Sequence, residues 1–162
     1  GQGGLSDTSK AMSCVLMLIG GSSGSTAGGL KTATVGILLL TIRATLAGRS
    51  EVTLRGRAIS HSRVMDAMTL TMIVLILFLA GSMVISVADG EAFLPAAFET
   101  ASAMGTVGVT TGITPGLSAF SHVFLITMMF LGRVGIMSFS VAFLARSRPA
   151  KLKYPTVEFM VG

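Results

Sequence analysis

Residues 64–87 form an apolar run of 24 residues with a single charged side chain, Asp66 near its start. A helix needs roughly 20 such residues to cross a hydrocarbon core about 30 Å thick. Charged residues make up only 12% of the whole chain, whereas soluble domains carry roughly 25%. The sequence therefore predicts an all-α membrane protein and excludes an ordinary water-soluble fold.

Residues 11–42 are predicted to form another crossing, but the middle of this segment is unusual. Residues 20–29 comprise nine Gly, Ser or Thr residues and one Ala. Each Gly costs a helix about 1 kcal/mol relative to Ala, and backbone groups released from a helix cannot face lipid unpaired. We therefore expect a broken helix, which in transporters marks an ion or substrate site. The alternative is a face of small residues for close helix packing, since GxxxG spacing occurs here too.

Residues 91–105 favour a helix too short to cross, followed by a Gly- and Thr-rich stretch. Within it, TVGVT at residues 106–110 closely resembles the TVGYG filter, whose carbonyls replace the hydration shell of potassium. Gly permits the backbone angles required, and the C-terminal end of the preceding helix favours a cation. The sequence thus predicts a re-entrant loop with an ion-binding filter formed by Thr106, Val107, Gly108 and Val109.

Residues 117–145 are the last predicted crossing, and their 29 residues exceed what a membrane needs. Gly132 and Gly135 flank Arg133 near the middle of this segment, so we expect a kink there. An Arg at membrane depth is expensive and normally faces a cavity or a polar partner. Residues 64–145 thus read as a helix, re-entrant loop, helix unit.

Basic residues are distributed unevenly along the chain. Five Arg fall within residues 43–63 and four Lys or Arg within residues 146–153, whereas residues 88–122 contain none. By the positive-inside rule, the 43–63 loop and the C-terminus are cytoplasmic and the 88–122 stretch is external. We expect a multi-pass protein of the cell membrane that contacts the lipid bilayer and binds no nucleic acid.

An enzyme is the rival class, because GSTAGGLKT at residues 24–32 superficially matches a phosphate-binding loop. Leu30 intervenes before Lys31 and displaces it from its phosphate-facing position. Paired acids, or His with Ser or Cys, are not brought together at membrane depth by the predicted elements. We therefore expect no catalytic residues, no cofactor and no metal beyond a transported cation. A secondary transporter of another family, with a solute site at the broken helix, is the alternative function.

Three segments together carry a family resemblance: residues 24–32, GTVGVTTGIT at residues 105–114 and FLGRVGIMSF at residues 130–139. They resemble the membrane subunit of the Trk/Ktr/HKT potassium transporters, which have four helix, pore-loop, helix repeats around one pore. The resemblance implies the end of the third repeat (residues 1–47), a cytoplasmic basic loop (48–63), the complete fourth repeat (64–146) and a cytoplasmic tail (147–162). We expect the chain to begin partway through a larger protein.

The same resemblance implies roles for particular residues. Gly108 matches the filter glycine that favours potassium, with sodium as the other candidate ion. The loop of residues 20–29 matches a gate that obstructs the pore below the filter, and Arg133 matches a basic residue that faces it. Lys31 is either a further gate partner or a residue that snorkels to the interface. The gate residues implied are Gly24, Ser25, Thr26, Gly28, Gly29 and Arg133.

The resemblance also implies partners. Homodimerisation of the membrane subunit is expected, together with a cytoplasmic ring of nucleotide-binding regulatory subunits. The function implied is channel-like potassium uptake through a selectivity filter gated by the intramembrane loop.

Overall fold

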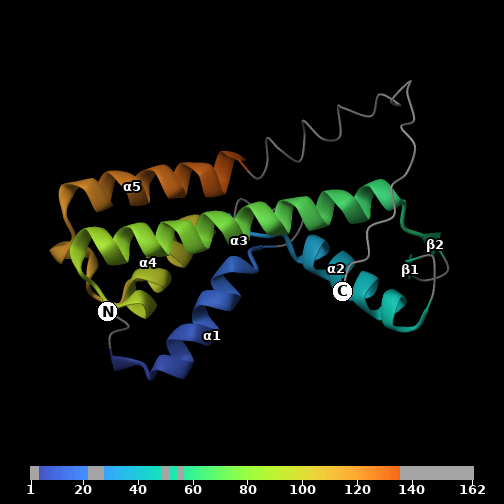
Figure 1. The fold of residues 1–162 in the computed structure, drawn as a ribbon, viewed down its shortest axis with the longest axis horizontal. Helices are drawn as coiled ribbons and strands as arrows, with labels where there is room; N and C mark the ends of the chain where they lie inside the picture. The colour runs from blue at the N-terminus through green and yellow to red at the C-terminus, as the bar shows by residue number, and fades with distance from the viewer. Residues whose placement is uncertain (1–3, 22–27, 49–51, 55–56, 136–162) are drawn as a thin grey trace.

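The structure is a computed structural model that describes residues 4–21, 28–48, 52–54 and 57–135 (Figure 1). Its elements follow in this order: α1 (Asp7–Leu18), α2 (Thr32–Leu46), β1 (Thr53–Leu54), β2 (Arg57–Ala58), α3 (His61–Asp89), α4 (Phe93–Gly105), the 3-10 turn η2 (Thr114–Gly116), α5 (Ala119–Phe130) and the π-helical turn η3 (Leu131–Gly135). The second half of the expected last crossing and the basic tail, residues 136–162, lie outside the described residues.

The fold is helical, as expected, apart from a short hairpin in the basic loop. Thr53 pairs with Ala58 and Leu54 with Arg57 in an antiparallel register. The N–H of Ile59 extends this pairing by donating to the carbonyl of Val52 at 2.8 Å. The sequence interpretation did not anticipate the hairpin, because two-residue strands leave almost no period-2 pattern to detect.

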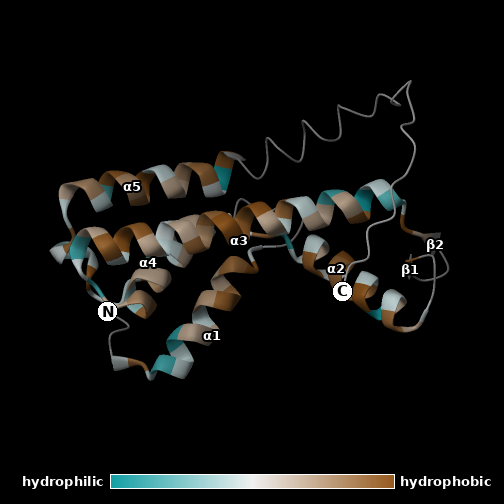
Figure 2. Cartoon of the chain, viewed as in Figure 1, coloured by the Kyte–Doolittle hydropathy of each residue, from teal (hydrophilic) through white to brown (hydrophobic). Residues whose placement is uncertain are grey.

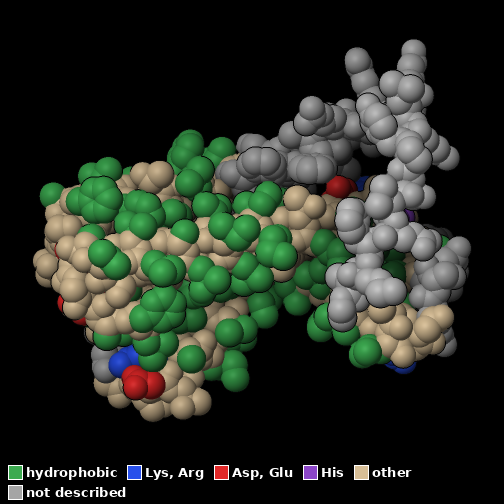
Figure 3. All heavy atoms as spheres, in the orientation of Figure 1, with side chains coloured by type: hydrophobic (Ala, Val, Ile, Leu, Met, Phe, Trp, Pro, Cys, Tyr) green, Lys and Arg blue, Asp and Glu red, His purple; other side chains and the backbone are tan. Residues whose placement is uncertain are grey.

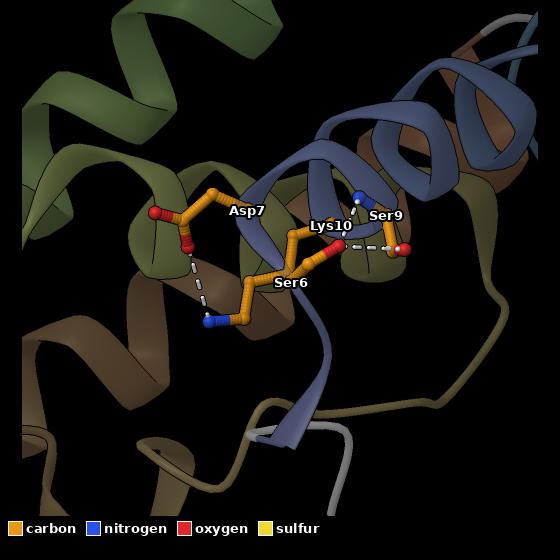
Figure 4. A network of polar contacts seen from close by, with 4 residues as sticks. All are labelled: Ser6, Asp7, Ser9 and Lys10. Carbon is orange, nitrogen blue, oxygen red and sulfur yellow. Dashed lines mark hydrogen bonds and ion pairs between the residues drawn. The ribbon is translucent and has the colours of Figure 1, made fainter.

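Helix α1 begins at a capped N-terminus (Figure 4). The hydroxyl of Ser6 accepts from the backbone N–H of Ser9 at 3.3 Å, which satisfies one of the free donors of the first turn. Lys10 pairs with Asp7 at 3.5 Å on the same turn. The polar start of α1 is thus separate from its apolar second half, where Cys14, Met17 and Leu18 are buried.

The helix break falls where the Gly-rich composition predicted it. Helix α1 ends at Leu18 and α2 begins at Thr32. The N–H of Leu30 donates to the carbonyl of Leu18 at 2.8 Å, and Ile19 and Leu30 form an isolated parallel bridge. The chain therefore leaves α1 and returns beside the end of the same helix before α2 starts. Residues 22–27 lie outside the described residues.

Helix α3 is, within the described residues, the one helix long and apolar enough to cross a membrane. Figure 2 shows a hydrophobic middle and a hydrophilic N-terminal end. The helix ends at Gly90, whose φ of 68° is the left-handed conformation typical of glycine after a helix. The apolar helix predicted at residues 64–87 is confirmed, with three further residues at its N-terminal end and two at its C-terminal end.

Helix α4 lies at the centre of the described structure, packed against α1, α3 and α5. Every residue from Ala96 to Gly105 is buried. Many of these residues are small, which lets neighbouring backbones approach closely. Gly81 of α3 shows how tight the packing is, since a Cβ there would lie 2.9 Å from the Cγ2 of Thr100.

The end of α3 and the start of α5 are joined by polar contacts. Asp89 accepts from the N–H of Ser118 at 2.8 Å and from the hydroxyl of Ser121. Ser118 is also the N-cap of α5, since its hydroxyl accepts from the N–H of Ser121. Helix α4 and the segment after it therefore form an excursion between two helix ends that lie together.

The outer surface of α3 and α5 is apolar. Figure 3 shows hydrophobic side chains across the face that these two helices form. Surface of this extent suits contact with lipid or with other membrane helices. Its large exposed side chains include Met68, Met72, Ile76 and Leu79 on α3 and Phe120, Val123, Ile126 and Met129 on α5.

Candidate ion pathway at the end of α4

The four predicted filter residues follow directly from the C-terminus of α4. Thr106 is the C-cap, with its N–H donating to the carbonyl of Ala103 at 3.1 Å. Val107 and Gly108 are exposed, whereas Val109 is half-buried. The negative end of the α4 dipole therefore lies beside an accessible backbone segment, which favours a cation.

Thr106 has an unusual backbone for a β-branched residue. Its φ of 53° lies in the left-handed region, where it is the one non-glycine residue of the described chain. That conformation costs roughly 1–2 kcal/mol for a residue with a Cβ, and such strain clusters at functional sites. Gly108 also lies in this region, with φ 82° and open space around its Cα.

Alternate residues of the filter segment are anchored to α4. Ser102 accepts from the N–H of Val107 with its carbonyl at 2.9 Å and from the N–H of Val109 with its hydroxyl at 3.0 Å. The N–H of Thr111 donates to the carboxyl of Glu99 at 2.9 Å. Two residues one helical turn apart, Ser102 through its carbonyl and its hydroxyl and Glu99 through its carboxyl, thus hold three N–H groups spaced two residues apart, the period of an extended chain.

Glu99 and Ser102 are site residues that the sequence interpretation missed. Both belong to the short helix that it predicted, but it assigned neither of them a role. Their i, i+3 spacing places them on one face of that helix. The available signal was that Glu99 is the one charged residue among residues 92–122.

The region of the helix break contacts the filter. The N–H of Gly28 donates to the hydroxyl of Thr106 at 3.0 Å. A Cβ on Gly28 would collide with the carbonyl of Met104, and one on Gly105 would lie 2.6 Å from the carbonyl of Met17. Glycine is therefore required at both positions for the chain after the break and helix α1 to reach the end of α4.

Helix α5 approaches the same point through its π-helical turn. Gly132 is buried, and a Cβ on it would lie 2.9 Å from the Cα of Met104 and collide with its carbonyl. A π turn is a common cause of a kink, and it falls where the sequence predicted one. Arg133 is the next residue, and its side chain is exposed.

The structure brings some of the predicted gate residues to the filter and leaves others undescribed. Gly28 contacts Thr106 directly through its N–H. Gly29 is the next residue in the chain and has a left-handed backbone, with φ 76°. Gly24, Ser25 and Thr26 lie outside the described residues. The contact of Arg133 with the gate loop therefore remains a prediction.

Lys31 lies at the start of α2, where it is half-buried and forms the N-cap. Its carbonyl accepts from the N–H groups of Thr34 and Val35. Its side chain makes no ion pair within the described residues. A role as gate partner also remains a prediction.

Metal-binding clusters of three or more His, Cys, Asp or Glu side chains do not occur in the described part of the chain. The donors around the filter are instead hydroxyl and backbone oxygens together with one carboxyl. Oxygen ligands of this kind suit hard cations.

Comparison with known proteins gives a consistent result. A family model described as TrkH, cation transport protein, matches residues 3–151. The potassium/sodium uptake protein NtpJ of Enterococcus hirae is 41% identical over 98% of the chain and 36% of its own length. The Ktr system potassium uptake protein B of Bacillus subtilis is 32% identical over 99% of the chain and 36% of its own length. The protein of the same description from Vibrio alginolyticus is 30% identical over 91% of the chain and 32% of its own length.

Proposed function

The chain belongs to the TrkH family of cation transport proteins, and from this premise we propose that it forms one pore segment of a potassium uptake protein. The family and the matched relatives are transport proteins rather than enzymes, in agreement with the class expected from the sequence. The chain spans about a third of the length of the curated relatives it matches. Membership in this family argues against a secondary transporter of another family.

The arrangement of α3, α4 and α5 is the observation that carries the proposal. Helix α4 is short and buried, and it lies between two helices whose ends meet at Asp89 and Ser118. An excursion that starts and finishes at one side of a membrane is a re-entrant loop. We assign residues 64–146 to such a helix, pore-loop, helix repeat, with residues 1–47 as the broken last helix of the preceding one.

The filter acts by replacing water around the ion. Backbone carbonyls of Thr106, Val107, Gly108 and Val109 take the place of hydration oxygens, as in other potassium filters. The dipole of α4 lowers the energy of a cation there. Potassium is the proposed substrate and sodium the competing ion, since one relative is described as a potassium/sodium uptake protein.

The gate of the proposed pore is the loop of residues 20–29. The contact between Gly28 and Thr106 supports a location directly beside the filter. Arg133 is assigned to hold this loop, because Gly132, its neighbour, already packs on the end of α4. Lys31, which follows the loop at the start of α2, is assigned as an additional partner of the gate.

The remaining assignments follow the same premise. The 48–63 loop and the 147–162 tail are placed on the cytoplasmic side of the cell membrane, because they carry the basic residues. There they would receive a ring of nucleotide-binding regulatory subunits. The membrane subunit itself would work as a homodimer. The names of two relatives, which place them in a Ktr system, support a membrane subunit that acts with other components.

The direct test is ion uptake by the full-length protein in a bacterial strain that lacks its own potassium uptake systems. Saturable potassium uptake that restores growth at low external potassium is the expected result. Sodium should be taken up with a lower Vmax/KM. Expression in the membrane without uptake of either ion would contradict the proposed function.

A further inference from the structure

We propose that Glu99 is the positioning residue of the filter: its buried carboxyl fixes the chain that directly follows Val109 by holding Thr110, Thr111 and Thr114. The inference rests on the proposed function and adds to it a residue that sets specificity. Glu99 touches no part of the ion path itself and acts through the loop that it holds.

The contacts of Glu99 are numerous for one side chain. Its Oε1 accepts from the hydroxyl of Thr110 at 2.7 Å, and from the N–H and the hydroxyl of Thr111, each at 2.9 Å. Its Oε2 accepts from the hydroxyl of Thr114 at 2.8 Å. All four donors lie within five consecutive residues, so one carboxyl determines the course of the chain from residue 110 to residue 114.

Among the residues that the structure describes, Glu99 forms no ion pair that could compensate its burial. Its exposed fraction is 5%, and residues 88–122 contain no Lys or Arg. Within the described ranges, the ion pair of the structure joins Lys10 to Asp7, on another helix. A buried carboxyl must be compensated by polar partners, and here the loop supplies them. The loop and the carboxyl therefore depend on each other.

The position of Glu99 explains why loss of its contacts would change the filter itself. Ser102 holds the N–H groups of Val107 and Val109, and Glu99 holds the next one in the same series, at Thr111. Without Glu99, the contacts of α4 with this chain would stop at Val109, since Ala103 holds Thr106 and Ser102 holds Val107 and Val109. Gly108 lies between the two residues that Ser102 holds and has a φ of 82°. We expect a shift of the chain beyond Val109 to alter this backbone.

A count of the hydrogens around the Glu99 carboxyl shows which substitution can remove its charge while keeping its contacts. Three oxygen contacts form a ring: Glu99 to Thr110, Thr110 to Thr114 at 2.8 Å, and Thr114 to Glu99. The two threonine hydroxyls bring two hydrogens to these three contacts. A glutamine amide placed with its nitrogen at Oε2 would supply the third and still accept from Thr111. Glu99→Gln should therefore keep the loop in position while removing any negative charge.

The experiment compares variants of the full-length protein by uptake of potassium and sodium over a range of concentrations. Glu99→Ala should lower the ratio of Vmax/KM for potassium to that for sodium by at least about tenfold, because it removes all four hydrogen bonds to the loop and about 1.4 kcal/mol already corresponds to a factor of ten. Glu99→Gln should restore most of this ratio. Thr114→Val, which removes only the contact to Oε2, should give a smaller fall.

Thr100→Val is the matched control. Thr100 is the next residue on α4 and is fully buried, but its hydroxyl donates to the carbonyl of Ala96 within the same helix. Loss of this hydroxyl should change the thermal stability of the protein without changing the ratio of Vmax/KM for potassium to that for sodium. Amounts of folded protein are compared by size-exclusion chromatography, and Thr114→Val provides the readout should Glu99→Ala fold poorly.

The outcomes separate the inference from the proposed function. Absence of saturable potassium uptake by the unmodified protein would contradict the proposed function. Normal uptake with an unchanged ion ratio in Glu99→Ala and Thr114→Val would overturn only the role of Glu99. An equal loss in Glu99→Gln and Glu99→Ala would also overturn it, because charge rather than position would then be responsible.

Discussion

The backbone N–H of Gly28 donates a hydrogen bond of 3.0 Å to the hydroxyl of Thr106, across 78 residues of sequence. This contact joins the chain after the helix break to the first residue of the proposed filter. Thr106 makes this contact with a left-handed backbone, a conformation that glycine would occupy with less strain. The threonine hydroxyl therefore has a role that glycine could not fill.

Thr106→Val keeps the shape of the side chain but removes the acceptor for the N–H of Gly28. A partly buried donor left unpaired costs about 1–3 kcal/mol, so we expect a lower thermal stability in detergent and weaker discrimination against sodium. Thr106→Ser retains the hydroxyl and should lose less of both. Equal stability and ion ratios in the Val and Ser variants would contradict a role for the hydroxyl.

Gly108→Ser should weaken the preference for potassium. A Cβ meets nothing within 4 Å at this position, so the effect comes from the backbone, where φ 82° costs a non-glycine residue about 1–2 kcal/mol. Competitive uptake of potassium and sodium measures the preference. Gly90→Ser is the control, since Gly90 has φ 68° and similar open space but caps α3. It should lose stability and keep the ion ratio.

Gly132→Ala should disturb the packing of α5 on α4, because the new methyl group would collide with the backbone of Met104. Backbone cannot move aside as a flexible side chain can, and overpacking costs about 1–3 kcal/mol. A lower melting temperature in detergent is the expected result. Gly36→Ala in α2, where a Cβ meets nothing within 4 Å, should instead raise stability, since Ala favours a helix over Gly.

Arg133→Ala should increase cation flux, because it removes both a positive charge from the proposed pore and the donor that holds the gate. A barrier lower by about 1 kcal/mol corresponds to roughly fivefold more flux. Arg133→Lys restores the charge without the fork of donors and should lie between the two. Uptake in proteoliposomes measures the effect, with Arg63→Ala at the exposed start of α3 as control. Unchanged flux and regulation in well-folded Arg133→Ala would count against the gate assignment.

Removal of part of residues 22–27 should also raise flux, because the proposed loop obstructs the pore. Expression should persist, since α1 and α2 each keep their own contacts. Flux equal to or below that of the unmodified protein, in correctly folded deletion variants, would mean that the loop has a structural role only.

The sequence allowed the helices to be predicted well and the contacts between them poorly. The break near residue 20, the apolar helix at residues 64–87 and the short helix before Thr106 all follow from local composition and length. The contacts of Glu99, of Gly28 with Thr106 and of Gly132 with Met104 depend on tertiary packing. Local preference carries no information on which distant residue will meet a given hydroxyl, carboxyl or glycine. The hairpin was missed because its strands are too short to show a period.

The bridge between Ile19 and Leu30 has a consequence for how this protein can vary over evolution. A chain excursion whose two ends are pinned together behaves as a closed loop, and its entropy changes only with the logarithm of its length. Changes in length that keep Gly20, Gly28 and Gly29 in place are therefore expected to leave the ends of α1 and α2 where they are. Under the proposed function, such changes would alter the bulk of the gate, and so the rate of ion flow, without altering the helices on either side of it.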